Sequence, residues 1–168
     1  MGVSETNKAY AQSGVNQRIS LVHMAQIAYT ENGDASIDLD RLRLTNDGNM
    51  DNVHMLRNTY HADFVALIIG TTTAGCGVAY LQAPGSNPNF DTDAFSVTLF
   101  DCISPNYTFA HELGHNMALN HDWFIEDSVT PYSYAHGFVN PANDWRTIMA
   151  YQNLCGGCPR LLYFSNPG

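Results

Sequence analysis

The stretch HELGHNMALNHD, from His111 to Asp122, decides how the rest of the chain is interpreted. His111 and His115 are four residues apart, so on a helix both side chains leave the same face, one turn apart. His121 comes six residues after His115, and the chain must turn back for it to reach the same point. Three imidazoles on one zinc ion leave a fourth position for water, as in catalytic zinc sites. We therefore predict that His111, His115 and His121 bind a catalytic zinc ion.

Glu112 follows the first histidine and would lie beside the metal without binding it. Zinc lowers the pKa of a bound water from near 16 to about 7, and a carboxylate can then take the proton and pass it to a leaving amine. We predict that Glu112 is this catalytic base. The competing interpretation, an exposed acid on a helix surface, is disfavoured by its position between two metal ligands.

This stretch resembles the signature of the metzincin zinc endopeptidases, HExxHxxGxxH followed by a family-specific residue. That residue is Asp122, as in the reprolysin-like (adamalysin-like) branch. The resemblance covers roughly residues 18–165. It implies a secreted bacterial zinc metallopeptidase, with an upper lobe built on a twisted sheet, zinc at the floor of a cleft, and an irregular lower lobe.

Ala118 departs from that signature, because the family has glycine there to end the helix in a left-handed turn. A non-glycine residue with positive φ costs about 1 kcal/mol. Asn120 could take the left-handed position instead, since asparagine tolerates it better than most residues. Two paths from the helix to His121 therefore remain open.

The segment Thr147–Tyr151, TIMAY, resembles the Met-turn of metzincins, a tight loop that places a methionine beneath the zinc. The resemblance assigns that place to Met149, which would support the histidines and not bind the metal. Tyr151 stands two residues later, as in the astacin and serralysin branches, where a tyrosine approaches the metal. Its hydroxyl could bind zinc or donate to a developing oxyanion. Simple packing of the ring is the alternative.

Helices and strands are expected to alternate over the first two thirds of the chain. Helices are expected over 4–13, 36–44, which Ser36 could cap, and 50–61. Strands are expected over 18–29, 63–70, 78–81 and 95–100, with a polar loop over 84–89. Strands 18–29 and 63–70 should pair in parallel through a right-handed crossover. Ser104 and Pro105 should open the helix that carries His111.

This order predicts an α/β (α+β) fold, and the metzincin resemblance implies a mostly parallel sheet with an antiparallel edge strand. The 168 residues fit one catalytic domain, residues 1–168, with an upper lobe over about 1–121 and a lower lobe over about 122–168. Residues 77–81 are expected to form the edge strand above the cleft. An extended peptide could pair there with Gly77, Val78, Ala79 and Tyr80, although a merely protected edge is the alternative.

Composition narrows the partners of this chain. Its formal net charge is −9 and it has one lysine, which disfavours binding to nucleic acid or to anionic membranes. Polypeptide substrates and a monomeric state are expected. An acidic surface is compatible with calcium binding, but no EF-hand loop supports a calcium site. We expect His136, within the segment 132–138, to belong to the wall of a substrate pocket and not to bind metal.

Four cysteines, Cys76, Cys102, Cys155 and Cys158, allow three pairings. We predict Cys76–Cys102, because both residues would leave the same end of two parallel strands, and Cys155–Cys158, which would close a short loop through two glycines. Disulfides indicate an oxidising compartment, so we expect a secreted protein whose signal and pro-segments are missing from this sequence. No run of 18 apolar residues is present.

These features favour a secreted zinc endopeptidase that cleaves internal peptide bonds. Two other functions remain open at this point. A zinc-dependent amidase acting on a smaller substrate would share the same chemistry. A catalytically impaired module that keeps zinc for stability would need a distorted site, for example through Ala118.

Overall fold

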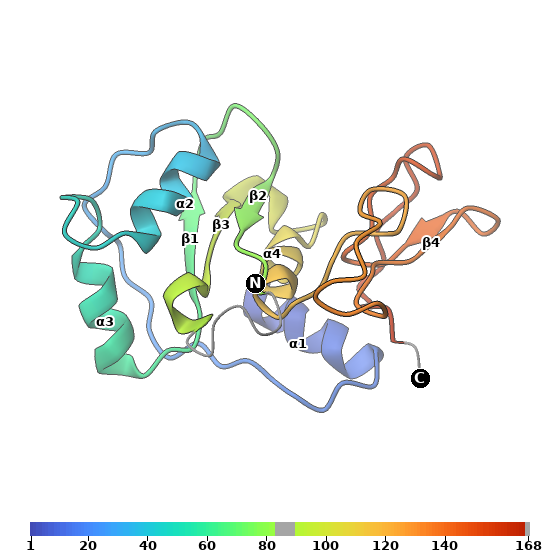
Figure 1. The fold of residues 1–168 in the computed structure, drawn as a ribbon, viewed down its shortest axis with the longest axis horizontal. Coiled ribbons are helices and arrows are strands. Elements are labelled where there is room, and N and C mark those ends of the chain that lie inside the picture. The colour runs from blue at the N-terminus through green and yellow to red at the C-terminus, as the bar shows by residue number, and fades with distance from the viewer. Residues whose placement is uncertain (83–89, 167–168) are drawn as a thin grey trace.

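A small mixed sheet stands between two layers of helices in the computed structural model, which describes residues 1–82 and 90–166 (Figure 1). The helices are α1 (Gly2–Gln12), α2 (Ala35–Arg43), α3 (Asn52–Tyr60) and α4 (Thr108–Asn116), with two short 3-10 turns, η1 (Phe90–Asp93) and η2 (Phe100–Cys102). Helices α2 and α3 cover one face of the sheet, and α4 covers the other (Figure 1). Helix α1 packs on α4.

The sheet contains β1 (Val65–Ile69), β2 (Gly77–Ala79) and β3 (Phe95–Leu99). Their order is β1-β3-β2, with β1 parallel and β2 antiparallel to β3. The central strand β3 is the most buried, since helices lie on both of its faces. The mixed α/β fold with an antiparallel edge strand, predicted from the sequence, is therefore confirmed.

The expected strand over 18–29 is wrong. This segment has no strand in the structure, and the side chains of Leu21, Val22 and Met24 are 62%, 50% and 82% exposed. The side chain of Asn7 pairs with both main-chain groups of Ile19, at 2.8 Å each, in place of a neighbouring strand. An apolar run alone does not supply the hydrogen-bonding partner that a strand needs. The parallel partner of β1 is β3 instead.

The helix caps also differ from the sequence predictions. Helix α2 is capped by Asp34, whose carboxylate accepts a hydrogen bond from Ser36 N at 2.8 Å, and not by Ser36. Helix α4 begins at Thr108, so Ser104 and Pro105 do not open it. Tyr107 has φ 55°, and this left-handed residue separates the helix from the preceding chain. The polar loop predicted over 84–89 lies outside the described residues.

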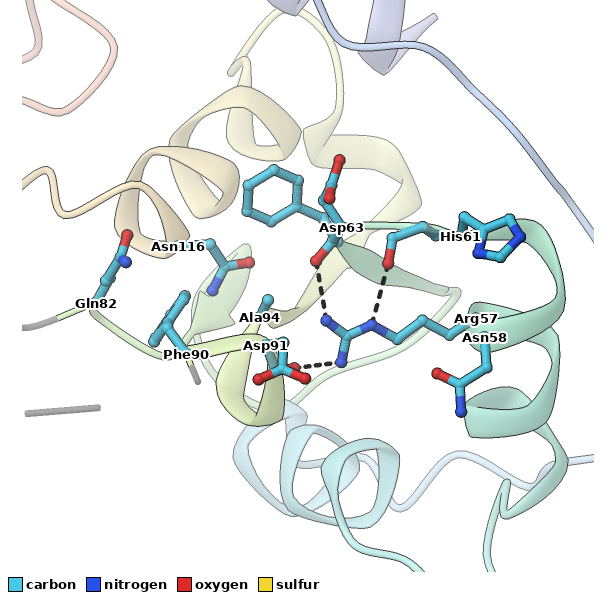
Figure 2. A pocket seen from close by; sticks show the side chains of 11 residues that line it. Arg57, Asn58, His61, Asp63, Gln82, Phe90, Asp91, Ala94 and Asn116 are labelled. Carbon is cyan, nitrogen blue, oxygen red and sulfur yellow. Dashed lines mark hydrogen bonds between the residues drawn. The ribbon is translucent and has the colours of Figure 1, made fainter. Parts of the chain in front are cut away.

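Arg57 joins α3 to the sheet (Figure 2). Its guanidinium donates to Ala62 O at 3.2 Å, to Asp63 O at 3.1 Å and to Asp91 O. It also lies 5.2 Å from the ring centroid of Phe95. These contacts hold the start of β1 beside η1, which leads into β3. The hollow in Figure 2 is lined by none of the three predicted zinc ligands.

The last third of the chain is irregular apart from a small hairpin, as the sequence predicted. Its strands are β4 (Val139–Asn140) and β5 (Trp145–Arg146). Ile148, Met149 and Phe164 from this part join Tyr10 of α1 and Ala110 of α4 in one buried cluster. This shared core fixes the last third against α4. None of the described helices is long and apolar enough to cross a membrane.

Ala118 itself adopts the left-handed conformation that reverses the chain after α4. Its φ is 69°, and its neighbour Leu119 donates from its N to Gly114 O at 2.9 Å, which closes the helix end. Asn120 does not have a positive φ, so the proposed alternative path through Asn120 is wrong. Asn120 instead forms a bridge with His136. The backbone strain of a positive φ therefore falls on Ala118, whose side chain is 4% exposed.

Both predicted disulfides, Cys76–Cys102 and Cys155–Cys158, are present. The first joins the segment before β2 to the turn after β3. The two cysteines of the first disulfide are 26 residues apart and those of the second are 3 residues apart, so the first closes a much longer loop.

Removal of the disulfides should lower stability unequally. Chain-entropy arguments give about 3.5 kcal/mol for a loop as long as Cys76–Cys102 and about 2 kcal/mol for one as short as Cys155–Cys158. We expect the Cys76→Ser/Cys102→Ser pair to cost more unfolding free energy than the Cys155→Ser/Cys158→Ser pair in urea denaturation. An equal loss in both double variants would contradict this account.

Substitutions at Ala118 test the left-handed turn. Ala118→Gly relieves about 1 kcal/mol of backbone strain but removes a buried methyl worth about 0.8 kcal/mol, so stability should change by less than about 1 kcal/mol. Ala118→Val places a β-branched residue at positive φ and should cost at least about 2 kcal/mol. Urea unfolding at fixed metal concentration measures both. A valine variant as stable as the wild type would argue against a left-handed residue 118.

Candidate metal centre

The imidazoles of His111, His115 and His121 converge on one point. His121 Nε2 lies 3.3 Å from His111 Nε2 and 3.1 Å from His115 Nε2, and one ligand atom from each residue lies within 4.8 Å of the others. Nitrogens bound tetrahedrally to zinc at about 2.0–2.1 Å would be about 3.3 Å apart. Among the residues that the structure describes, no other group of three His, Cys, Asp or Glu side chains converges in this way. The donor set and its spacing therefore fit a zinc ion.

The opposite ring nitrogens are engaged by the main chain. His111 Nδ1 lies 2.8 Å from Ile148 O, and His115 Nδ1 lies 2.8 Å from Leu119 O. A carbonyl oxygen only accepts, so each Nδ1 must carry the proton. The lone pair is then on Nε2, the atom that faces the common point. This orientation by neighbouring carbonyls is typical of metal-binding histidines.

Burial keeps the imidazoles uncharged at neutral pH. His111 is 4% exposed, and burial lowers its pKa well below the usual value. Burial, followed by the neighbouring His121, lowers the pKa of His115 to about 4. Burial also lowers the pKa of His121. Only neutral imidazole binds metal, so the three side chains are in the required state without further deprotonation.

Glu112 follows His111 in α4 and is buried, with 4% of its surface exposed. A Cβ atom on Gly77 would lie 2.7 Å from Glu112 Oε1, so the carboxylate packs directly against β2 and needs glycine there. Within the described residues, Glu112 accepts no hydrogen bond. Burial raises its pKa to about 8, with a smaller opposing effect from Arg160. A divalent cation beside it would lower that pKa by direct attraction.

Met149 packs against α4. Its side chain is 1% exposed, and a Cβ atom on Gly114 would lie 2.4 Å from its sulfur. Gly114 lies between His111 and His115 in the helix, so the sulfur supports the helix directly behind these two residues. The preceding residue, Ile148, supplies the carbonyl that orients His111.

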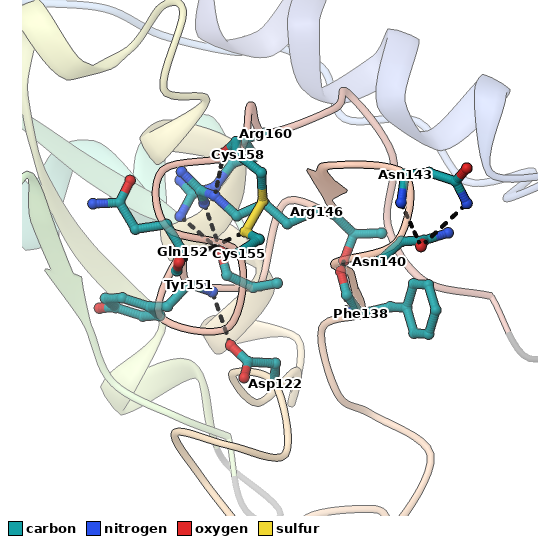
Figure 3. The surroundings of a disulfide bond; sticks show 12 residues. Asp122, Phe138, Asn140, Asn143, Arg146, Tyr151, Gln152, Cys155, Cys158 and Arg160 are labelled. Atoms are coloured by element: carbon teal, nitrogen blue, oxygen red, sulfur yellow. Dashed lines mark hydrogen bonds between the residues drawn. A yellow bond between two sulfur atoms is a disulfide. The ribbon is translucent and has the colours of Figure 1, made fainter.

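Tyr151 stands beside the histidines with its ring 41% exposed. Its ring centroid lies 4.7 Å from that of His121 and 6.1 Å from that of His111, edge-on in both cases. Tyr151 N donates to Asp122 Oδ2 at 2.8 Å (Figure 3). Phe124 N donates to the other oxygen, Asp122 Oδ1, at 3.2 Å. Asp122, the residue after the last histidine, therefore joins this part of the chain to the Met-turn.

His136 does not line a pocket wall. It is 5% exposed, and its Nδ1 lies 2.8 Å from His121 O while its Nε2 lies 3.0 Å from Ser128 O. Its ring stacks on Trp123 with centroids 3.6 Å apart. His136 thus holds the main chain of His121 in place. An isolated histidine in the sequence gives no sign of such a contact.

Strand β2 forms an edge of the sheet next to α4. Gly77, Val78 and Ala79 make up this strand, and Tyr80 follows it. Gln82 N donates to His115 O at 3.0 Å, so the chain after β2 is held against the helix. In the part of the chain that the structure describes, neither Gly77 nor Ala79 has a main-chain hydrogen bond outside the sheet.

Arg146 and Arg160 were not predicted from the sequence. The charge of Arg160 acts on His111 and His121, and Arg146 lies opposite Arg160 in a β-bridge. Figure 3 shows their guanidinium groups beside the Cys155–Cys158 disulfide. Both donate to Ala150 O, at 2.6 and 3.3 Å. Burial, followed by the neighbouring Arg146, lowers the pKa of Arg160 to about 10. The chain has few cationic residues, and Arg146 and Arg160 both stand among apolar residues. This placement is the feature of the sequence that could have pointed to them.

Comparisons with known proteins agree with this site. A model of the reprolysin-like metallo-peptidase family M12B matches residues 1–167. Three relatives share the name peptidyl-Asp metalloendopeptidase. The protein from Xanthomonas campestris pv. campestris is 42% identical over 168 residues, covering 99% of this chain and 38% of the relative. The protein from Stenotrophomonas maltophilia R551-3 is 41% identical over 170 residues, covering 99% and 39%. The protein from Pseudomonas fragi is 35% identical over 164 residues, covering 97% and 83%.

This chain thus spans about two fifths of the length of the first two relatives. A solved structure described as a chaperone-substrate complex aligns with a TM-score of 0.71 at 21% identity, covering 99% of this chain and 25% of that chain. This last likeness concerns the fold alone. The family match and the 35% identical relative, of which this chain covers 83%, confirm the resemblance inferred from the histidine signature. The chain belongs to the reprolysin-like metallopeptidases of family M12B.

Proposed function

We propose that this chain is a zinc-dependent endopeptidase domain. The observation that carries the proposal is the convergence of three neutral imidazole nitrogens beside a buried carboxylate, Glu112, at the edge of a sheet. The family match and the names of the relatives support it, although the first two relatives are much longer.

The proposed reaction uses His111, His115 and His121 as the metal ligands. A bound zinc ion would act as a Lewis acid and lower the pKa of water from near 16 to about 7. Glu112 would accept a proton from the attacking water and deliver it to the leaving amine. Its lack of a hydrogen-bonding partner among the described residues leaves both carboxylate oxygens available for this transfer.

Tyr151 is proposed to donate from its hydroxyl to the oxygen that becomes negative as the carbonyl is attacked. Its ring stands edge-on to two ligands and is partly exposed. Burial, followed by the nearby Glu112, raises the pKa of Tyr151, so the hydroxyl keeps the proton it would donate. Met149 would act only as support beneath α4.

Strand β2 is proposed to align the substrate. An extended peptide can add to the free edge through main-chain hydrogen bonds at Gly77 and Ala79, which depend little on the sequence of the peptide. Glu112 packs against Gly77, so a peptide paired here would lie close to the base. From the names of the relatives, we propose that the cleaved bonds adjoin aspartate residues.

We further propose that residues 1–168 act as one catalytic domain that is secreted and monomeric. The two disulfides support an oxidising compartment. The buried cluster shared by α1, α4 and the Met-turn supports a single domain. Both proposals can be checked by secretion of the natural precursor and by the mass of the purified protein in solution.

Loss of the base should stop hydrolysis without loss of the metal. We expect Glu112→Gln to lower kcat/KM for an unfolded protein substrate by about 10²- to 10⁴-fold, because proton transfer is lost while the histidines are unchanged. Cleavage and bound zinc are measured together on both proteins. Asp127→Asn, an exposed change in the following segment, is the matched control and should keep full activity. Undiminished cleavage by Glu112→Gln would exclude Glu112 as the base.

Removal of the metal should reduce both activity and stability. At free zinc about 1,000-fold above its dissociation constant, binding to the folded state adds about 4 kcal/mol. We therefore expect a chelator to abolish cleavage and lower the Tm, and added zinc to restore both. His121→Ala should already behave like the chelated protein. A protein that binds zinc with full occupancy but cleaves no substrate would favour a zinc-stabilised binding module.

A further inference from the structure

Arg146, which is buried, and Arg160, which is partly exposed, lie side by side, and neither forms a salt bridge within the described residues. Arg146 and Arg160 face each other across an isolated β-bridge and share the carbonyl of Ala150. In residues 1–82 and 90–166, the only salt bridge within 4.0 Å joins Arg43 to Asp93. Burying a charge without a counter-charge costs free energy, and two like charges next to each other raise that cost. A negative group from outside the chain would reduce it.

Arg160 is the arginine that faces the catalytic side chains. Its Nη1 donates to Asn106 O at 2.7 Å, just before α4, and its Nη2 donates to Ala150 O in the Met-turn. Burial raises the pKa of Glu112 and of Tyr151, and the charge of Arg160 opposes both shifts. Its guanidinium therefore lies between the start of the histidine helix and the Met-turn, within electrostatic reach of both groups.

Arg146 is more buried than Arg160 and donates to two carbonyls within the protein. It is 8% exposed, and it donates to Cys158 O at 3.1 Å and to Ala150 O at 2.6 Å. Asp122 and Tyr151 both favour the charged form of Arg146. Arg146 thus has Asp122 as an acidic neighbour, whereas the acidic groups that act on Arg160 are Tyr151 and Glu112, both at the candidate site.

Arg160 has donors that the protein does not use. A guanidinium carries five N–H groups, and the two contacts of Arg160 to carbonyls engage only part of them. Its Nε is buried and has no hydrogen-bonding partner among the described atoms. The planar fork of arginine matches the two oxygens of a carboxylate. Nε is closed off from solvent, so the N–H groups of Nη1 and Nη2 beyond those two contacts are the ones that suit a carboxylate ligand.

We propose that Arg160 binds the side-chain carboxylate of a substrate aspartate and thereby sets the specificity of cleavage. The proposal rests on the endopeptidase function proposed above. The formal net charge of −9 repels acidic peptides, so a preference for aspartate requires a local positive charge at the site. Arg160 provides it next to Glu112 and Tyr151.

The test uses the 168-residue protein with zinc bound and two peptides that differ only by aspartate or asparagine at one position. We expect the wild type to favour the aspartate peptide in kcat/KM by on the order of 100-fold, as a charge-assisted bidentate contact would give. In Arg160→Gln this ratio should fall to within about threefold, while cleavage of the asparagine peptide changes by no more than about threefold. Arg146→Gln is the matched control and should keep the wild-type ratio.

Thermal unfolding and zinc content establish that each variant is folded. If Arg160→Gln does not fold, Arg160→Lys replaces it, with Arg146→Lys as its control, since lysine keeps the charge but loses the fork. An unchanged ratio in the Arg160 variant, or an equal loss on both peptides, would overturn the proposal. So would a wild type without preference for aspartate, although the endopeptidase function would then stand. A zinc-loaded wild type that cleaves neither peptide nor an unfolded protein would overturn the proposed function itself.

Discussion

The metal centre depends on two hydrogen bonds from imidazole Nδ1 atoms to main-chain carbonyls. One carbonyl, Ile148 O, belongs to the Met-turn, and the other, Leu119 O, belongs to the turn that ends α4. Each bond fixes the tautomer and rotation of a ring, so that Nε2 faces the common point. The last third of the chain therefore contributes to the site without supplying a ligand. Its packing against α1 and α4 through Phe164 and Tyr10 keeps these carbonyls in place.

Close packing places several glycines where no other residue fits. A side chain at Gly77 would meet the Glu112 carboxylate, and one at Gly114 would meet the Met149 sulfur. The site thus lies between an edge strand on one side and a methionine on the other, with the helix between them.

Charge is distributed unevenly over this acidic protein. Its net charge is −9, yet the buried Arg146 and the partly exposed Arg160 lie next to each other beside the Met-turn. Burying a guanidinium costs free energy because the group loses its hydration, unless hydrogen bonds or a counter-charge compensate for the loss. The guanidinium of Arg160 lies between the Met-turn and the start of α4. Its positive charge favours an anion near Glu112. The same charge opposes the rise that burial causes in the Glu112 pKa.

The sequence alone determined the ligand helix and the order of most helices and strands, because these depend on spacing and periodicity over short distances. It allowed three pairings of the four cysteines, and the structure decided for the predicted one. His111 and His115 must share a face of any helix that contains them. The sequence did not determine that residues 18–29 lack a strand, that Asp34 caps α2, or that Ala118 takes the left-handed turn. It also gave no sign that Arg160 would lie beside Glu112. These features depend on partners far away in the chain, and only the tertiary structure decides which partners a residue meets.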